Sequence, residues 1–210
     1  MQVPLKIIAE GGSGEVVEKK SRFIAQIFPI KTEEEALELL AQVRKKHYDA
    51  RHNCFAYVIG EKNETERCSD DGEPSGTAGR PMLDVITGQG IHDVLVVVTR
   101  YFGGTLLGTG GLVRAYSAAV KAGLENCRVM EKIRGYQVVV KTDYNNLGKI
   151  QYIAAGMELP EQNSEYGENV ELTYTVPEEK AAAFEREITE KTGGKSKVDR
   201  GDETWIYLNI

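Results

Sequence analysis

Hydrophobic and polar residues along this chain follow two different periods, which predicts that strands and helices alternate in its first half. Residues 15–30, 52–60 and 93–102 are rich in β-branched and aromatic residues, as strands are. The third of these stretches is apolar almost throughout, so we expect a strand that is buried on both faces. Residues 64–69 are expected to return as the hairpin partner of the second.

Helical spacing predicts three helices between these strands. The first covers residues 31–50, where Thr32 and Glu35 fit a capping box, acids crowd the first turn and bases crowd the last. A short helix is expected around residues 78–87, and a longer one over residues 111–127. The residues expected to face the core are Ala36, Leu37, Leu40 and Val43 in the first helix, and Leu112, Val113, Tyr116, Ala119, Val120 and Leu124 in the last.

From residue 135 onward the pattern predicts a strand, a helix, two strands, a helix and a strand. Pro177 and Gly193 bracket the second of these helices, as Pro at a helix start and Gly just past its end usually do. This βαββαβ order is that of the ferredoxin-like split βαβ sandwich. No low-complexity linker precedes it, so we expect an α+β protein with two domains, residues 1–134 and 135–210.

Composition restricts the class of protein further. Apolar residues make up 41% and charged residues 28% of the chain, which is ordinary for a globular protein. No apolar run is long enough to span a membrane, and the N-terminal stretch lacks the pattern of a secretory signal. The three cysteines, Cys54, Cys68 and Cys127, cannot all pair and form no CxxC motif, which favours reduced thiols in the cytoplasm.

Charge is distributed unevenly along the chain. The net charge is −6, but residues 1–134 contain 18 Lys and Arg against 18 Asp and Glu. Residues 135–210 contain 8 and 14, so the second half carries the whole acidic excess. A general electrostatic attraction for nucleic acid is therefore not expected. Any site for a polyanion must be local and must lie in the first half.

Two glycine-rich stretches stand out, residues 69–83 and residues 99–116. The second follows a buried strand and precedes a helix, a context in which backbone N–H groups and a helix N-terminus bind anions. An NTPase is disfavoured because Thr109 stands where a P-loop needs lysine. A dinucleotide enzyme is disfavoured because Val113 replaces the third glycine of its motif. Alternatively, these glycines only permit tight turns and close packing.

The first stretch contains three carboxylates within four residues, Asp70, Asp71 and Glu73. The alternating acidic pattern of a calcium-binding loop is missing, so we favour a turn whose carboxylates cap nearby N–H groups over a metal site. The same stretch also offers hydroxyls, glycine amides and an adjacent arginine, which are groups that bind phosphate. We therefore expect both stretches to contribute to one type of site.

The expected site binds phosphate or nucleic acid and needs no cofactor or metal. No combination of residues here is sufficient for catalysis, so we expect no catalytic residue. The expected binding residues are Gly76, Thr77, Arg80, Arg100, Tyr101, Gly103, Gly104, Gly110, Gly111 and Arg114. The expected supporting residues are His52, Asp70, Asp71, Glu73 and Ser75.

Four motifs together closely resemble the IMPACT/YigZ family: SRFIA, HNCFAYVIG, DDGEPSGTAGRPML and TRYFGGTLLGTGGLVRAYSAA. The second half is similar to the ferredoxin-like domain of bacterial members and to a C-terminal domain of elongation factor G. The resemblance implies a first domain similar to the second domain of a small-subunit ribosomal protein, with a left-handed βαβ crossover. Eukaryotic relatives regulate translation initiation under amino-acid stress and carry an RWD domain, which this chain is expected to lack.

The resemblance and the residues together favour a non-enzymatic cytoplasmic protein associated with translation. It would bind RNA, the ribosome or a translation-factor partner through the glycine-rich loops, without DNA sequence specificity or membrane contact. One alternative is an enzyme or binding protein for a phosphorylated small molecule, with Asp70, Asp71, Glu73 or His52 as acid–base groups. Another is a protein–protein regulator whose loops are only structural. The acidic second domain would dock protein or orient the first.

Overall fold

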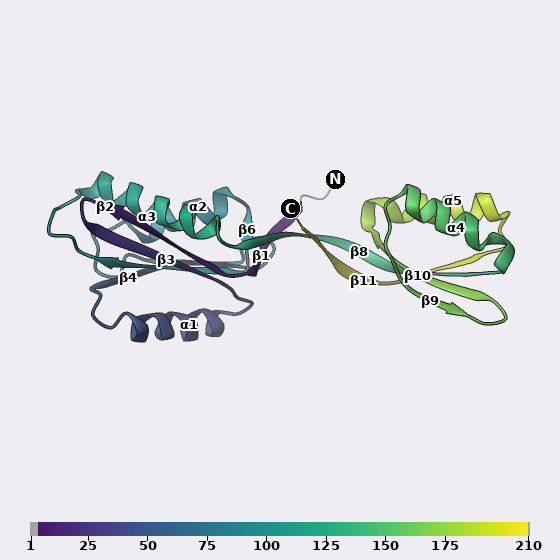
Figure 1. The fold of residues 1–210 in the computed structure, drawn as a ribbon, viewed down its shortest axis with the longest axis horizontal. Helices are drawn as coiled ribbons and strands as arrows, with labels where there is room; N and C mark the ends of the chain where they lie inside the picture. The colour runs from purple at the N-terminus through teal and green to yellow at the C-terminus, as the bar shows by residue number, and fades with distance from the viewer. Residues whose placement is uncertain (1–3, 210) are drawn as a thin grey trace. The chain divides into compact units, whose positions relative to one another are not determined.

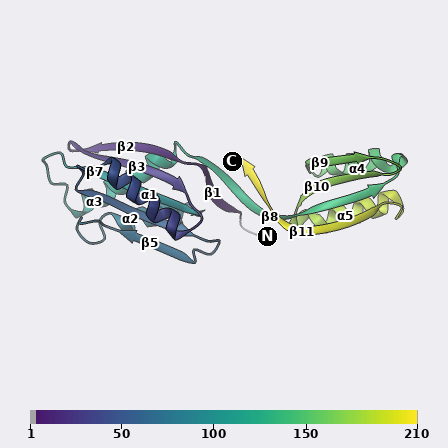
Figure 2. The same cartoon turned by 90° about the horizontal axis from the view of Figure 1, so that it is seen from below.

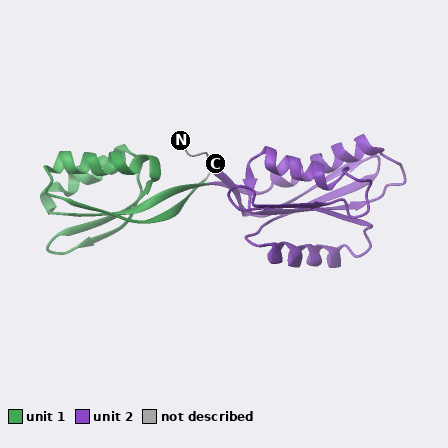
Figure 3. Ribbon diagram, turned by 180° about the vertical axis from the view of Figure 1, so that it is seen from behind, with its two compact units in different colours: residues 1–4, 132–208 green, residues 5–131, 209–210 purple. Residues whose placement is uncertain are grey.

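The computed structural model describes residues 4–209, and its elements are labelled in Figure 1. Residues 1–3 and Ile210, which the two expected domains include, lie outside the described residues. Residues 5–131 and residues 132–208 form two compact units, called unit 2 and unit 1 (Figure 3). Each unit combines helices with a sheet, so the predicted α+β class is confirmed. Within the described part, no helix is long and apolar enough to cross a membrane.

Strands and helices alternate along both units. Unit 2 contains β1 (Leu5–Glu10), β2 (Gly12–Glu18), β3 (Ser21–Pro29), α1 (Glu33–Lys46), β4 (His52–Ile59), β5 (Thr65–Ser69), α2 (Gly79–Gly88), β6 (Ile91–His92), β7 (Val94–Tyr101) and α3 (Thr109–Leu124). Strand β8 (Arg128–Thr142) begins in unit 2 and ends in unit 1. Unit 1 continues with α4 (Tyr144–Gly156), β9 (Glu161–Tyr166), β10 (Val170–Pro177), α5 (Glu178–Thr192) and β11 (Lys197–Asn209).

The sheet of unit 2 has the strand order β2-β3-β7-β4-β5, and every neighbouring pair is antiparallel. Helices α2 and α3 cover one face and α1 covers the other (Figures 1 and 2). Both β3 and β4 pair with β7, so they run parallel to each other and α1 forms the crossover between them. Because helices cover both faces, β7 is buried at every residue before Tyr101, as its apolar sequence predicts.

Helix α1 buries a narrower stripe than its sequence predicts. Its N-terminus is capped as expected, since the Thr32 hydroxyl accepts the Glu35 N–H. Ala36, Leu40 and Val43 are buried, but Leu37 is 52% exposed, so the prediction is wrong there. One residue advances a helix by about 100°, which turns Leu37 off the edge of the stripe that begins at Ala36.

Glycines allow α3 to lie directly on strand β2. A Cβ atom added to Gly14 would lie 2.4 Å from the Ala122 carbonyl carbon, and one added to Gly12 would lie 2.5 Å from the Asn126 carbonyl oxygen. These distances are far below a normal contact, so larger residues would force the helix away from the sheet. This part of the sequence therefore determines how closely α3 packs.

Unit 1 has the ferredoxin-like architecture that its βαββαβ order predicts. Its strands lie in the order β11-β8-β10-β9, and α4 and α5 cover the same face (Figure 1). Alternate β10 residues point into the core, where Tyr174 and Phe184 pack edge to face with ring centroids 5.4 Å apart. The C-cap Gly193 adopts the left-handed conformation, which ends α5 where expected.

The other face of this sheet is largely polar. Strands alternate their side chains, so the residues of β8 and β10 that do not face the core lie on this side. Lys141 and Glu171 are opposite each other there and form an ion pair at 2.9 Å. Gln137, Val139, Thr173 and Thr175 also lie on this face.

We expect Gly14→Ala to lower the free energy of unfolding of unit 2 by about 1–3 kcal/mol, because its methyl group would collide with the α3 backbone. Gly88→Ala is the matched control, since a Cβ there meets nothing within 4 Å and alanine favours a helix. Urea unfolding of both variants measures the difference. Equal stability of the two variants would contradict the role given to Gly14.

Candidate functional site

Both glycine-rich stretches lie at one end of the sheet of unit 2, which we call the loop end. Strand β7 ends there, and β3 and β4 begin there because β7 is antiparallel to both. Arg22 lies opposite Tyr101, and His52 lies opposite Arg100. The segments gathered at the loop end are the β2–β3 turn at residues 19–20, the segment 47–52 after α1, the loop 70–78 and the loop 102–108.

A buried ion pair joins the two glycine-rich stretches. The Arg100 guanidinium donates from Nη1 to Glu73 Oε1 at 2.7 Å, and the two side chains are only 7% and 3% exposed. The Tyr116 hydroxyl, from α3, donates to the same oxygen at 2.9 Å. The Arg100 Cζ atom also lies 5.4 Å from the ring centroid of Phe23. The carboxylate of Glu73 therefore connects its own loop to β7 and to α3.

The groups around this ion pair are protonated. Burial raises the pKa of the Cys54 thiol to about 12, and it lies 3.3 Å from the Tyr116 hydroxyl. Burial, followed by the nearby Cys54, raises the pKa of Tyr116 as well, so its hydroxyl remains a hydrogen-bond donor. Burial also raises the pKa of Cys68 and of Cys127. No thiol here is activated as a nucleophile.

The side-chain carboxylate of Asp70 lies at the N-terminus of α2. Its carboxylate accepts the backbone N–H of Gly76 at 2.8 Å and those of Ala78 and Gly79 at 2.9 Å. Burial alone would raise the pKa of Asp70, but the three N–H donors outweigh it and the pKa lies below its ordinary value. The amide expected at Gly76 to bind phosphate thus binds Asp70, whose carboxylate caps the nearby N–H groups.

Asp71 and His52, two further candidates of the sequence, are also engaged within the protein. The Asp71 carboxylate accepts from Arg44 Nη2 at 2.8 Å and from the Asn53 N–H at 2.7 Å. His52 Nδ1 lies 2.8 Å from the Asp71 carbonyl oxygen. Across residues 4–209, no three His, Cys, Asp or Glu groups come together in a way that could hold a metal ion.

The remaining candidates of the first stretch do not converge on a common point. Thr77 is buried and its hydroxyl donates to the Pro74 carbonyl oxygen at 2.6 Å. Arg80 is exposed on α2 and forms an ion pair with Asp84 at 2.8 Å. Ser75 is exposed in the loop. The loop 70–78 therefore satisfies its own polar groups.

Gly103 is fixed by close packing against the β2–β3 turn. Its N–H donates to the Ser21 hydroxyl at 3.1 Å, and a Cβ atom there would lie 2.0 Å from the Lys20 carbonyl carbon. Only glycine fits this approach, so the close-packing interpretation applies to Gly103. Its neighbour Gly104 is exposed, with a φ of +85° that favours glycine.

The N-terminus of α3 differs from that of α2, because no side chain caps it. Its N-cap residue is Gly108, and Gly110 and Gly111 lie in its first turn. The exposed Arg114 lies one turn further, with Nη1 3.6 Å from the place a Cβ on Gly110 would occupy. The first-turn amides and one guanidinium are thus presented together, as at an anion site.

The two aromatic residues after the buried part of β7 differ in their surroundings. The Tyr101 hydroxyl donates to Asp49 at 2.9 Å and lies 3.0 Å from His47 Nδ1, which ties it to the end of α1. Phe102 is 53% exposed, and its ring centroid lies 5.6 Å from Arg100 Cζ. Phe102 therefore has the freer ring of the two.

Acidic and basic groups at the loop end are used differently. The carboxylates of Asp49, Asp70, Asp71 and Glu73 all accept hydrogen bonds from within the protein, and Glu18 is the exception. Four exposed cations at this end have no ion pair with any described residue, and they are Lys19, Lys20, Arg51 and Arg114. Three of these four are not among the expected site residues. The loop end therefore exposes four cations that no ion pair neutralises.

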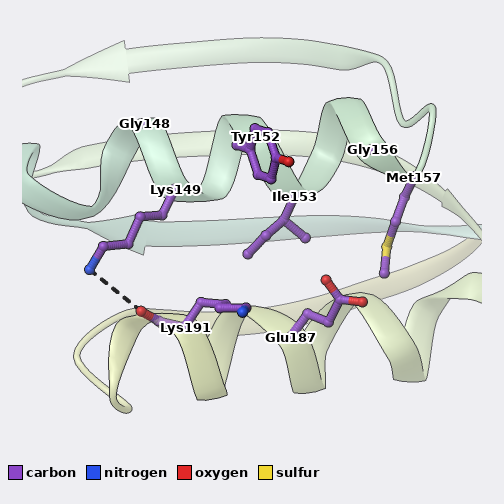
Figure 4. A pocket seen from close by; sticks show the side chains of 8 residues that line it. All are labelled: Gly148, Lys149, Tyr152, Ile153, Gly156, Met157, Glu187 and Lys191. Atoms are coloured by element: carbon purple, nitrogen blue, oxygen red, sulfur yellow. Dashed lines mark hydrogen bonds between the residues drawn. The ribbon is translucent and has the colours of Figure 1, made fainter.

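A groove of about 730 Å³ lies between α4 and α5 of unit 1 (Figure 4). Tyr152 lies along it with the two glycines Gly148 and Gly156 on either side, and Lys149 donates to the Lys191 carbonyl oxygen at 3.5 Å. None of the residues expected to bind phosphate lines this groove.

Comparison with known proteins identifies both halves of the chain. Residues 19–124 match the Impact N-terminal domain, and residues 140–195 match a domain of unknown function, DUF1949. YvyE, an IMPACT family member of Bacillus subtilis, is 43% identical over 95% of this chain and 92% of its own. The chain belongs to the IMPACT family.

Further relatives within the IMPACT family agree with this. YigZ of Escherichia coli is 37% identical over 86% of this chain and 89% of its own. A crystal structure of a hypothetical protein, 33% identical in sequence, matches with a TM-score of 0.60 and covers 100% of this chain and 98% of that chain. The resemblance inferred from the four motifs is therefore confirmed.

We expect Glu73→Gln to lower the free energy of unfolding of this IMPACT-family protein by about 3–5 kcal/mol, because Arg100 would stay buried without a counter-charge. Asp84→Asn is the control: it breaks the exposed pair with Arg80 and should cost less than about 1 kcal/mol. Urea unfolding at neutral pH provides both values. A small loss for Glu73→Gln would show that the ion pair does not hold the loops.

Asp70→Asn should lower stability at about pH 7 by about 1–2 kcal/mol, because the side-chain NH2 group would replace the oxygen that accepts the Gly76 N–H and the carboxylate charge would be lost. Because the pKa of Asp70 is lowered by folding, its charge stabilises the fold above the pKa of the unfolded chain, near pH 4. That contribution is lost as the pH falls through the lower pKa of the folded state. The stability difference between wild type and variant should therefore narrow below about pH 4, and a constant difference would argue against the role of the charge.

Proposed function

We propose that the loop end of unit 2 binds the phosphate backbone of RNA, and that the protein is a non-enzymatic cytoplasmic component of the translation apparatus. The observation that carries this proposal is the charge arrangement at the loop end. Most of its carboxylates accept hydrogen bonds from their own protein, whereas Lys19, Lys20, Arg51 and Arg114 are exposed without ion pairs. Such cations bind phosphates and release their counterions.

The location of these cations supports a local site rather than general attraction. The chain as a whole has a net charge of −6, so unspecific binding of RNA over its entire surface is disfavoured. The excess of acids belongs to residues 135–210. A polyanion that approaches this protein is therefore attracted to the loop end and repelled by much of the remaining surface.

Backbone groups at the start of α3 add to the cations. The uncapped helix presents N–H groups at its first turn, where the helix dipole favours negative charge. Among the residues expected from the sequence, Gly104, Gly110, Gly111 and Arg114 remain suited to bind phosphate. Arg100, Gly76 and Arg80 are instead used in contacts within the protein.

Two observations support a binding protein over an enzyme. Asp70, Asp71, Glu73 and His52, the candidate acid–base groups, all make hydrogen bonds inside the protein. The thiols have raised pKa values, which disfavours a cysteine nucleophile. Family membership adds support for translation, since the resemblance to IMPACT proteins implies that process.

Unit 1 supports a different contribution. Many ferredoxin-like domains that bind RNA stack bases on aromatic residues of the open sheet face. On β8 and β10, that face carries Gln137, Val139, Lys141, Glu171, Thr173 and Thr175, and no aromatic residue. We therefore assign RNA contact to unit 2 and a protein-docking or orienting role to unit 1.

Arg114→Ala should weaken binding to a mixed RNA pool and to ribosomal subunits, because one phosphate contact is lost. For single-stranded RNA, the slope of the logarithm of affinity against the logarithm of salt concentration should fall by about 0.7. Arg186→Ala, which removes an exposed arginine from α5 of unit 1, is the matched control and should change neither quantity. Titrations at low and near-physiological salt provide both.

If the wild-type protein does not bind RNA more tightly than an acidic control protein, the proposal is wrong. A phosphorylated small molecule would then be the better candidate ligand, as the glycine-rich loops also suggest. Inorganic phosphate added as a competitor distinguishes the two cases. A polyanion that makes several contacts resists low concentrations of phosphate, whereas a single phosphate group is displaced.

A further inference from the structure

We propose that Phe102 is a stacking platform for one base of single-stranded RNA. This inference rests on the proposed function and specifies which form of RNA the loop end recognises. Phe102 is 53% exposed at the end of a strand whose other residues are buried, with the exception of the half-buried Tyr101. A large exposed aromatic ring beside unpaired cations is the combination that single-strand-binding proteins use.

The guanidinium group of Arg100 packs against the ring of Phe102. Arg100 Cζ lies 5.6 Å from its centroid, within the range of a cation–π contact. Arg100 cannot move freely, because it is 7% exposed, bonded to Glu73 and packed against the ring of Phe23. A ring that rests on a fixed guanidinium loses little conformational entropy when a base stacks on it.

The loop on either side of Phe102 is fixed as well. Gly103 packs on the Lys20 backbone and donates its N–H to Ser21, which places the β2–β3 turn beside the ring. Lys19 and Lys20 of that turn are exposed. A base stacked on Phe102 would therefore have its flanking phosphates near these lysines. One short segment of RNA could then contact the ring and the lysines together.

Tyr101 is less suited to this role than its neighbour. Its hydroxyl is held by Asp49 and lies beside His47, and the Arg22 guanidinium carbon lies 5.8 Å from its ring centroid. The ring is thus covered and anchored by its own protein. Phe102 also has an arginine beside its ring, but it has no hydroxyl to be held and is 53% exposed, which makes it the ring that a ligand can reach.

The proposal predicts a preference for single strands over duplexes. In an A-form duplex the bases are stacked on one another, so a protein ring cannot reach their faces. A single strand can turn one base outward, and stacking on an aromatic side chain then adds to the phosphate contacts. The four unpaired cations can contact phosphates of a single strand or of a duplex, because these contacts do not require an unstacked base.

The test is the affinity of the full chain for a short oligoadenylate and for a duplex of equal length. Phe102→Ala should weaken single-strand binding about tenfold and leave duplex binding unchanged within about twofold. Phe102→Trp should restore single-strand binding, because it restores the ring. Tyr152→Ala removes an exposed ring from unit 1 and serves as the control, with no expected effect.

Three outcomes would overturn the inference. If Phe102→Ala binds the single strand as wild type does while Arg114→Ala binds weakly, stacking is wrong and phosphate binding stands. If Phe102→Ala weakens both forms of RNA equally, the ring acts on the loop rather than on a base. If the wild-type protein binds no RNA at all, both this inference and the proposed function fail. Thermal unfolding of each variant verifies that the fold is intact.

Discussion

The loop end depends on one buried ion pair, between Arg100 and Glu73. Two charges removed from water are costly on their own, and each is tolerated only because the other lies within hydrogen-bond distance. The pair therefore restricts both glycine-rich stretches to arrangements that keep the two groups in contact. Tyr116 adds a bond from α3 to the same carboxylate, so the helix is included in that restriction. Flexible glycine sequences are thus joined to each other and to α3 at one carboxylate.

Most other acids of the loop end also accept hydrogen bonds from within the protein. Glu73 balances Arg100, Asp71 binds Arg44, and Asp70 is held by the amides at the start of α2. Asp71 and Glu73 are each balanced by an arginine of the protein, and Lys19, Lys20, Arg51 and Arg114 remain exposed without an ion pair. Residues 1–134 contain equal numbers of acidic and basic residues, and the fold nevertheless gathers exposed, unpaired cations at one end of the sheet. The average charge of a domain does not reveal this arrangement.

Periodicity in the sequence was sufficient for most of the fold and for little of the site. Apolar spacing identifies α1, β7 and α3, but β6 has only two residues and is formed by pairing with β1, which no local pattern reveals. For the site, one signal was present. Arg100 interrupts an apolar strand, and a buried charge requires a partner. The candidates for that partner were Asp70, Asp71 and Glu73. The spacing of residues in the sequence does not define the position of the loop 70–78, so it could not single out Glu73.

The contact of Gly103 with Ser21 spans 82 positions of the sequence. Closing so long a loop is slow compared with forming local helices. It also requires β3 and β7 to be paired, since Arg22 lies opposite Tyr101 in that pair. A chain still being synthesised can therefore form α1 early, but it acquires the loop end only after β7 and the residues that follow have left the ribosome. A nascent copy thus has no ligand-binding surface until this unit is almost complete.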